Sequence, residues 1–158
     1  MAVVEHHFGA VERIFKRREV KVTGQGMIEM EARLKYLTEQ KRMEVAERLR
    51  QALAEGGDLS ENAEYEDAKN EQAFVEGEIQ RLETIITSAE IIETTTGKKD
   101  KVELGAMITV MEKGSKDKEV YRLVGSAEAN PREGKISVES PLGRALLGAK
   151  VGENVKVK

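Results

Sequence analysis

Two long helical patterns, separated by a pair of glycines, constrain the fold of this chain more than any other feature. Residues 27–55 contain no proline and no glycine, and Thr23 precedes them as a candidate N-cap. Apolar residues recur there every three or four positions, which is typical of an amphipathic helix. They form one stripe, interrupted at Lys41, that contains Met27, Met30, Leu34, Leu37, Val45, Leu49 and Ala52.

The stretch that follows the glycines has a more regular repeat. Its apolar stripe alternates spacings of four and three, the heptad pattern of a helix that packs on another helix. Two such helices joined by a short glycine-containing loop form an antiparallel hairpin. Arms of about 30 residues, at about 1.5 Å per residue, would reach about 45 Å. The expected seam of the second arm contains Ala68, Gln72, Val75, Ile79, Leu82, Ile86 and Ala89.

The rest of the chain has a different pattern. Short segments, often β-branched, are separated by glycine, Asn-Pro or Ser-Pro, which predicts strands joined by turns. The segment PLGRALLG, residues 141–148, predicts a short helix or turn between strands. The expected strands are residues 106–111, 119–124, 135–138 and 154–157.

These patterns predict an α+β fold with two parts. An N-terminal antiparallel coiled-coil hairpin would span residues 23–93, with its tip at 56–65, GGDLSENAEY. A small α+β domain would occupy residues 101–158, after a polar linker at 94–100. Residues 1–22 form an N-terminal extension to which the sequence assigns no role.

Composition supports an elongated intracellular protein. Charged residues make up 35% of the chain, above the roughly 25% of ordinary globular domains. There is no cysteine, hence no disulfide and no thiolate metal site, and the net charge of −3 points to no particular partner. We find no apolar run long enough to span a bilayer and no signal peptide pattern. We therefore expect a cytoplasmic protein that does not associate with membranes.

Asp58 and Glu61 at the predicted tip allow two interpretations. Asp-x-x-Glu at the start of a helix resembles a capping box, and acidic residues in a first turn favour the helix dipole. However, seven acidic residues and one basic residue, Lys69, lie between Glu55 and Glu71, which is more negative charge than capping requires. Residues 27–53, in contrast, contain six basic and five acidic residues. Such a separation of charge suggests a partner for each part of the rod.

Two carboxylates on an exposed turn are a poor magnesium site by themselves. Mg²⁺ prefers six oxygen ligands and releases its waters reluctantly. The pair would, however, complete a site to which another protein and a phosphate supply the other oxygens. A metal ion in such a shared site lowers the pKa of a bound water and so assists phosphodiester hydrolysis.

The segment GDLSENAEY, continuing as EDAKNEQAFVEGEIQRLE, resembles the Gre transcript cleavage factors of bacterial RNA polymerase, in particular those of the GreA type. The resemblance extends over roughly residues 19 to 157 and includes KRMEVAERLR before the tip. In the C-terminal part it includes GAMITVMEK, YRLVGSAEA and ISVESPLGRALLG.

This resemblance implies a coiled-coil hairpin followed by an FKBP-like domain, and a factor that is not itself an enzyme. The hairpin would enter the secondary channel of RNA polymerase, into which a backtracked nascent RNA extrudes its 3′ end. Asp58 and Glu61, assisted by Ser60, would help to hold the second Mg²⁺ of the polymerase active site, and the polymerase would then cleave its own transcript. The isolated protein would bind no metal and would be a monomer.

The resemblance also implies two contact surfaces. Lys69 matches the family's basic patch below the tip, which would contact the RNA. Ala54 occupies the position on the first arm where the family has a basic residue. We add Arg48 and Arg50 as further candidates for contact with RNA. The family usually continues beyond Val157 and Lys158 with a turn and a final strand. The candidates for docking on polymerase, which are equally well explained as core residues of the small domain, are Pro141, Leu142, Leu146 and Leu147.

Three other functions stay open at this point. The chain could be an antagonist with the same fold that occupies the channel without promoting cleavage, although the intact Asp58–Glu61 pair argues against this. It could be a coiled-coil adaptor whose acidic tip only aids solubility. An autonomous metal hydrolase is disfavoured because no second cluster of ligands is evident.

Overall fold

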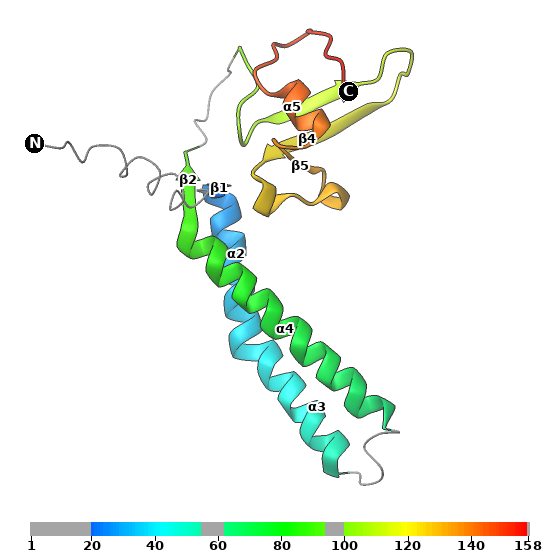
Figure 1. Ribbon diagram of the computed structural model, residues 1–158. Helices are drawn as coiled ribbons and strands as arrows, with labels where there is room; N and C mark the ends of the chain where they lie inside the picture. Colours follow the sequence, from blue (N-terminus) through cyan, green and yellow to red (C-terminus); the bar gives the residue numbers. More distant parts are fainter. Residues whose placement is uncertain (1–19, 55–61, 94–99, 158) are drawn as a thin grey trace, which may run out of the picture. The chain divides into compact units, whose positions relative to one another are not determined.

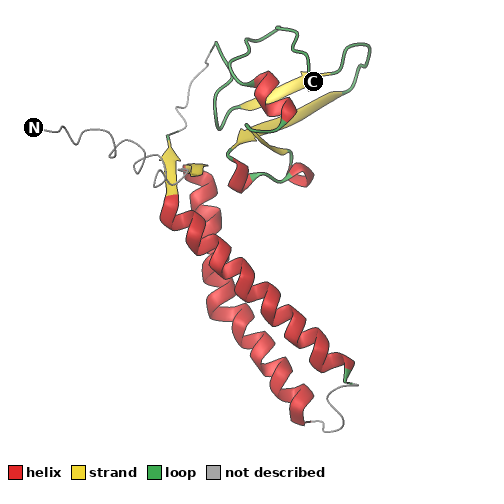
Figure 2. Ribbon diagram, viewed as in Figure 1, coloured by secondary structure: helices red, strands yellow, loops and turns green. Residues whose placement is uncertain are grey.

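The computed structural model describes residues 20–54, 62–93 and 100–157 of this protein. The chain forms two compact units. One is the helical segment Gln25–Thr87, and the other combines the residues up to Gly24 with Ser88–Lys158. The long helices form an N-terminal hairpin, and a small sheet with short helical segments forms the C-terminal part (Figures 1 and 2), so the expected α+β fold is confirmed. No helix in the described part of the chain is both long enough and apolar enough to cross a membrane.

The hairpin consists of two antiparallel arms that lie side by side (Figure 1). The first arm contains α2 (Gly24–Tyr36), a π-helical turn η1 (Leu37–Lys41) and α3 (Arg42–Ala54). The second arm is the single helix α4 (Ala63–Ser88). The predicted helical hairpin therefore forms, with its arms joined through residues 55–61, which lie outside the described residues.

The seam between the arms is largely the predicted one. Its buried members are Met27, Met30, Leu37, Val45 and Ala52 in the first arm and Ala68, Val75, Ile79 and Leu82 in the second. The prediction is wrong at Gln72, which is exposed. The half-buried neighbour Glu71 takes its place, because the seam there meets Lys41, whose Nζ lies 2.6 Å from Oε1 of Glu71.

The π-helical turn accounts for the interruption of the stripe at Lys41. Stripe positions 37, 41, 45 and 49 are each four residues apart. Four residues exceed one α-helical turn by about 40°, so three such steps would rotate the stripe away from α4 by roughly 120°. In the π turn the backbone N–H of Arg42 donates to the carbonyl of Leu37, which accommodates one extra residue. Leu37 and Val45 consequently remain buried on either side of it.

Two short strands at the base of the hairpin were not expected from the sequence. Strand β1 (Val20–Thr23) pairs in parallel with β2 (Ala89–Ile92), so that Val22 lies opposite Ile91. Parallel strands require a long crossover connection, and the hairpin provides it. The predicted helical position of Ala89 is therefore wrong, because α4 ends at Ser88 and a β-branched segment follows it. Most of the N-terminal extension (1–19) and of the linker (94–99) lies outside the described residues.

The C-terminal sheet has the order β3-β4-β5. Strand β3 (Met107–Met111) is antiparallel to β4 (Lys118–Val124), and β4 is parallel to β5 (Lys135–Ser137). The connection between β4 and β5 contains the 3-10 turns η2 (Ser126–Glu128) and η3 (Pro131–Glu133), and helix α5 (Pro141–Leu146) follows β5. The buried apolar residues of this unit are Val22, Leu123, Val124, Ile136 and Leu146.

Three of the four predicted C-terminal strands and the short helix are confirmed. The strand predicted at residues 154–157 is wrong, since no strand is assigned there in the described chain. The chain makes a turn just before this segment instead. The N–H of Glu153 donates to the carbonyl of Lys150, whose own N–H donates to the Glu153 carboxylate at 2.9 Å. A β-branched pattern alone does not form a strand without a paired neighbour.

Strand β1 contacts the residues that follow β4 at two points. Glu128 in η2 accepts hydrogen bonds from the backbone N–H of Thr23, at 2.8 Å, and from its hydroxyl. Gly125 lies so close to β1 that a β-carbon at this position would overlap the carbonyl oxygen of Lys21. The absence of a side chain at Gly125 therefore permits this contact.

We predict that Gly125→Ala lowers the free energy of unfolding by about 1–3 kcal/mol, because the backbone of β1 must shift to make room. Gly77→Ala is the matched control. Gly77 lies within α4 with no atom near its added β-carbon, so alanine should stabilise by about 0.5–1 kcal/mol. Urea unfolding followed by circular dichroism measures both. Equal stability of Gly125→Ala and the unmodified protein would contradict the close contact.

Candidate functional site

The tip of the hairpin is the strongest candidate for a functional site, and the structure describes its two flanks. The first arm is described to Ala54, and the second from Asn62. Asp58, Ser60 and Glu61 lie outside the described residues, so their proposed roles stay predictions. The flanks nevertheless establish which residues complete the helix ends and which charges surround the tip.

Asn62 joins the two arms next to the tip. Its Oδ1 accepts a hydrogen bond from the backbone N–H of Tyr65 at 3.1 Å, the typical bond of an N-cap residue. Its Nδ2 donates to the carbonyl of Ala52 in the last turn of α3, at 3.2 Å. Ala52 in α3 and Ala68 in α4 both have small, buried side chains. Asn62 therefore caps α4 and ties it to α3.

This observation bears on the capping interpretation of the acidic pair. Helix α4 begins at Ala63, and the residue before it, Asn62, provides the capping oxygen. A capping box with Asp58 as N-cap would instead begin its helix at residue 59. The cap of α4 is thus supplied without Asp58 or Glu61.

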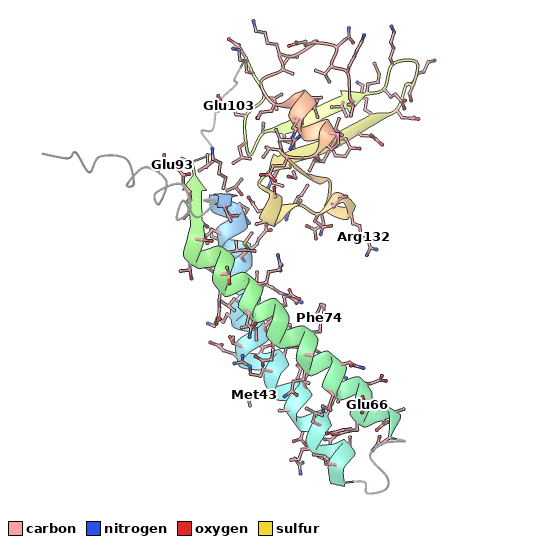
Figure 3. All side chains as sticks on the ribbon, viewed as in Figure 1. Met43, Glu66, Phe74, Glu93, Glu103 and Arg132 are labelled. Atoms are coloured by element: carbon pink, nitrogen blue, oxygen red, sulfur yellow. The ribbon has the colours of Figure 1, made fainter. Side chains whose placement is uncertain are left out.

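The first turns of α4 carry a concentration of negative charge. Glu64, Glu66 and Asp67 are exposed and make no ion pair with any residue that the structure describes. Figure 3 shows Glu66 near the tip end of α4. These carboxylates interact favourably with the N-terminal end of the helix dipole. They also maintain a negative potential next to the tip.

The three basic candidates near the tip have different surroundings. Arg48 forms an ion pair with Glu71 of α4. Arg50 binds Glu47 through two hydrogen bonds of 2.7 and 2.8 Å. Lys69 is exposed, and its Nζ lies 5.5 Å from the centroid of the Tyr65 ring. An RNA phosphate would therefore compete with carboxylates for both arginines, whereas the ammonium group of Lys69 lies over an aromatic ring.

Ion pairs between the arms explain much of the charge pattern of the rod. Basic side chains of the first arm reach glutamates of α4 at four places, so the first arm is compensated by the second. The described pairs are Arg33–Glu78 at 3.1 Å, Lys41–Glu71 at 2.6 Å, Arg42–Glu76 at 2.7 Å and Arg48–Glu71. Most of the shaft's positive charge is thus used internally, and the acidic excess remains near the tip.

These contacts shift the pKa values of the carboxylates in a consistent direction. The hydrogen bonds from Arg50, and secondly from Gln51, lower the pKa of Glu47 from 4.5 to about 2. Hydrogen bonding to Lys41 lowers the pKa of Glu71, and Arg42 lowers that of Glu76. All three carboxylates are therefore ionised at neutral pH and serve as charge partners, not as proton carriers.

The proposed docking residues divide into two groups. Leu146 is 6% exposed and belongs to the core beneath the sheet. Leu142 is half-buried, whereas Pro141 and Leu147 are exposed. Only the exposed members offer a surface to a partner.

Sequence reasoning missed Asn62 and Glu71, which organise the site's flanks. The preference of asparagine for N-cap positions was a usable signal for Asn62. The possible capping role was assigned to Asp58 and Glu61 instead. Glu71 differs from the predicted seam residue Gln72 by one position, and only the partner Lys41 identifies it. Within the described ranges no group of three or more histidine, aspartate or glutamate side chains is placed to hold a metal ion.

We predict that Asn62→Ala lowers the free energy of unfolding by about 1 kcal/mol or more, since it removes the cap of α4 and the bond to Ala52. Asn62→Asp keeps the capping oxygen but loses the donor, so its effect should be smaller. Asn70→Ala, an exposed substitution within α4, is the matched control and should not destabilise. Urea unfolding followed by circular dichroism gives the comparison. An Asn62→Ala protein as stable as the control would show that Asn62 does not cap the helix.

We further predict that Arg50→Ala raises the pKa of Glu47 from about 2 toward its ordinary value of 4.5. Because the folded-state pKa is depressed, the stabilisation from this pair is present above about pH 4.5 and is lost as the pH falls toward 2. NMR titration of the side-chain carboxyl of Glu47 measures the shift. An unchanged titration in Arg50→Ala would show that the pair does not persist in solution.

Comparison with known proteins places the chain in one family along most of its length. The family model described as "Transcription elongation factor, N-terminal" matches residues 20–91, and "Transcription elongation factor, GreA/GreB, C-term" matches residues 97–158. The GreA protein of Caldanaerobacter subterraneus subsp. tengcongensis is 48% identical over 141 residues, 89% of each chain. That of Lactococcus lactis subsp. cremoris is 49% identical over 136 residues, 86% of each chain.

Among solved structures, the chain is similar to the GreA factor homolog 1 (Gfh1) protein of Thermus thermophilus, with 31% sequence identity and a TM-score of 0.44. The match covers 89% of this chain and 90% of that one. The resemblance recognised in the tip segment is therefore confirmed by the family models and by the relatives. This chain belongs to the GreA/GreB family of transcription elongation factors.

Proposed function

We propose that this protein binds bacterial RNA polymerase in the cytoplasm, inserts its hairpin into the secondary channel and stimulates cleavage of backtracked nascent RNA. The protein acts as a factor that completes the polymerase's own hydrolytic site. Membership of the GreA/GreB family supports this proposal, since the relatives are named transcription elongation factors. The proposed partners are the polymerase and the 3′ end of the nascent RNA.

The single observation that carries the proposal furthest is the cap of α4. Asn62 supplies the capping oxygen to the N–H of Tyr65 and closes the end of the hairpin on Ala52. Asp58 and Glu61 are consequently not required to begin the helix. Two acidic residues at the tip that are not needed to cap α4 support a role in chemistry.

The donor chemistry of the tip fits magnesium in part. Carboxylate oxygens are the hard ligands that Mg²⁺ prefers, but Asp58 and Glu61 provide too few of them for six-coordination. When bound in a shared site, the ion would lower the pKa of water and assist attack on a phosphodiester. The task of this chain would be to deliver the two carboxylates, with Ser60 between them in sequence. Exposed Glu64, Glu66 and Asp67 would add negative potential that favours a cation over an anion.

Positive charge near the tip would orient the RNA. Of the three candidates, Lys69 is exposed on α4 and makes no ion pair within the described residues. Arg48 and Arg50 would have to exchange Glu71 and Glu47 for a phosphate. The proposed grip on RNA therefore relies mainly on Lys69 and is weak. Docking on polymerase would involve exposed Pro141 and Leu147, not Leu146.

We predict that Asp58→Asn and Glu61→Gln each reduce transcript cleavage by about ten- to a hundredfold or more, because each removes a charged ligand from a shared metal site. The assay adds the full-length protein and Mg²⁺ to a stalled, backtracked polymerase whose RNA is labelled away from its 3′ end. Glu64→Gln, an exposed acid at the start of α4, is the matched control and should cleave normally. Binding to polymerase should be retained in all three variants.

Other outcomes of this assay would contradict the proposal. Binding that blocks the channel without cleavage would identify an antagonist, and absence of binding would leave an adaptor of some other complex. Hydrolysis of RNA by the protein without polymerase would identify an independent enzyme. Cleavage that persists undiminished in both Asp58→Asn and Glu61→Gln would show that the acidic pair has no role in the reaction.

A further inference from the structure

Tyr65 and Lys69 form a contact in the first turns of α4 that helix formation does not require. The two residues are four positions apart, so their side chains lie on one face of the helix. Tyr65 is half-buried, whereas Lys69 is exposed. The ammonium nitrogen of Lys69 lies 5.5 Å from the centroid of the Tyr65 ring, within the range of a cation–π interaction. The ring therefore restrains the charged end of a long and otherwise flexible side chain.

The backbone of Tyr65 is fixed by the end of the hairpin. Its N–H donates to Oδ1 of Asn62 at 3.1 Å. Nδ2 of Asn62 donates in turn to the carbonyl of Ala52 in α3, at 3.2 Å. Tyr65 is thus connected through Asn62 to both arms. A half-buried ring that is attached in this way is a firm support for the side chain of Lys69.

Lys69 has an acidic neighbour on its own helix but does not pair with it. Glu66 lies three residues before Lys69, a spacing at which oppositely charged side chains of a helix commonly interact. Both residues are exposed, and no ion pair joins them. Arg48 and Arg50, the other basic candidates near the tip, bind carboxylates instead. Among the described residues near the tip, Lys69 is therefore a cation that is restrained without being neutralised.

A second tyrosine in the hairpin shows the same kind of contact with a different outcome. In the first arm, the guanidinium carbon of Arg33 lies over the ring of Tyr36, also 5.5 Å from its centroid. Arg33 forms an ion pair with Glu78 as well, at 3.1 Å, so its charge is compensated within the hairpin. The charge of Lys69 is not compensated by an ion pair in the described chain. This difference favours an anionic ligand from outside the protein at Lys69.

We propose that Tyr65 is a positioning residue, whose ring holds the ammonium group of Lys69 in place for a phosphate of RNA. An aromatic ring attracts a cation through its quadrupole but carries no net charge, so the ammonium group keeps its full charge for an anion. A carboxylate partner would first have to be displaced. Restraint of the side chain in advance also lowers the conformational entropy that lysine loses on binding. This inference rests on the proposed function, in which the RNA is the backtracked transcript.

The first measurement concerns the free, full-length protein and needs no polymerase. Protons above the face of an aromatic ring are shifted upfield in NMR spectra. The ε-methylene protons of Lys69 should therefore be shifted upfield in the unmodified protein and in Tyr65→Phe, which keeps a ring. They should return to the ordinary position of lysine in Tyr65→Leu, which keeps an apolar side chain and favours the helix. Ordinary positions in all three proteins would overturn the proposal.

The second measurement is fluorescence anisotropy of the labelled protein with a backtracked polymerase and with one that is not backtracked. Tyr65→Leu should weaken binding to the backtracked complex about two- to fivefold, which corresponds to an exposed cation–π contact. Lys69→Ala should weaken it about tenfold, as expected for a charged hydrogen bond. Neither change should affect binding to the other complex. Tyr65→Phe should bind as the unmodified protein does.

The double variant separates positioning from direct contact. Because a positioning residue acts only through the lysine, Tyr65→Leu should have no further effect in the Lys69→Ala protein. An equal loss from Tyr65→Leu with and without Lys69 would overturn the proposal, since the ring would then act on its own, through a nucleobase or through packing. Tyr36→Leu is the matched control, because it removes the same kind of contact from the first arm and should bind both complexes normally. Circular dichroism checks that each variant remains helical.

Failure of the proposed function would give a different result. The unmodified protein would then bind neither complex, which would overturn the RNA ligand while the NMR contact between Tyr65 and Lys69 persists. Equal binding of the unmodified protein and of Lys69→Ala to the backtracked complex would overturn only the role of Lys69 as a phosphate contact.

Discussion

The meeting of two long helices along one narrow seam, in a single register, is the constraint on which the rest of this structure depends. An apolar heptad seam by itself tolerates a shift of one arm against the other, because its contacts are alike in every repeat. Here one position of the seam is occupied by an ion pair. Half-buried Lys41 binds Glu71 at the π-helical turn. A shift of either arm would separate Lys41 from Glu71, so this ion pair favours the observed register. The exposed pairs such as Arg42–Glu76 contribute little stability individually but repeat the same register.

A fixed register has a direct consequence for the tip. The arms end together, so that Asn62 reaches the carbonyl of Ala52 and closes the hairpin from within the described helices. The ends of the helices are thus completed by an uncharged side chain. The start of α4 therefore does not require the acidic residues of the tip. The two helical arms are thus held together without the acidic residues of the tip. This links the fold to the proposed function.

The sequence predicted the elements that arise from local periodicity and missed those that arise from partners. The arms, the strands at 107–111 and 118–124 and the helix after Ser140 follow from spacing and from turn residues. Strands β1 and β2 could not be found in this way, because each is four residues long and exists only through the other. The place of Glu71 depends on Lys41, thirty positions away in the sequence, and on a π turn that the four-residue spacing of positions 37, 41, 45 and 49 indicates only indirectly. For the site, the tip motif identified the family, whereas the pairing of Arg48 and Arg50 with glutamates required the structure.

The central claim is that the acidic pair at the tip is dispensable for the fold. The most direct measurement is the free energy of unfolding of the double variant Asp58→Asn with Glu61→Gln, obtained from urea unfolding followed by circular dichroism at neutral pH. Our account predicts a change within about 0.5 kcal/mol of the unmodified protein, as for surface substitutions that touch no cap. A loss of about 1 kcal/mol or more, the cost of removing a helix cap, would show that the pair serves the hairpin itself and would contradict the account.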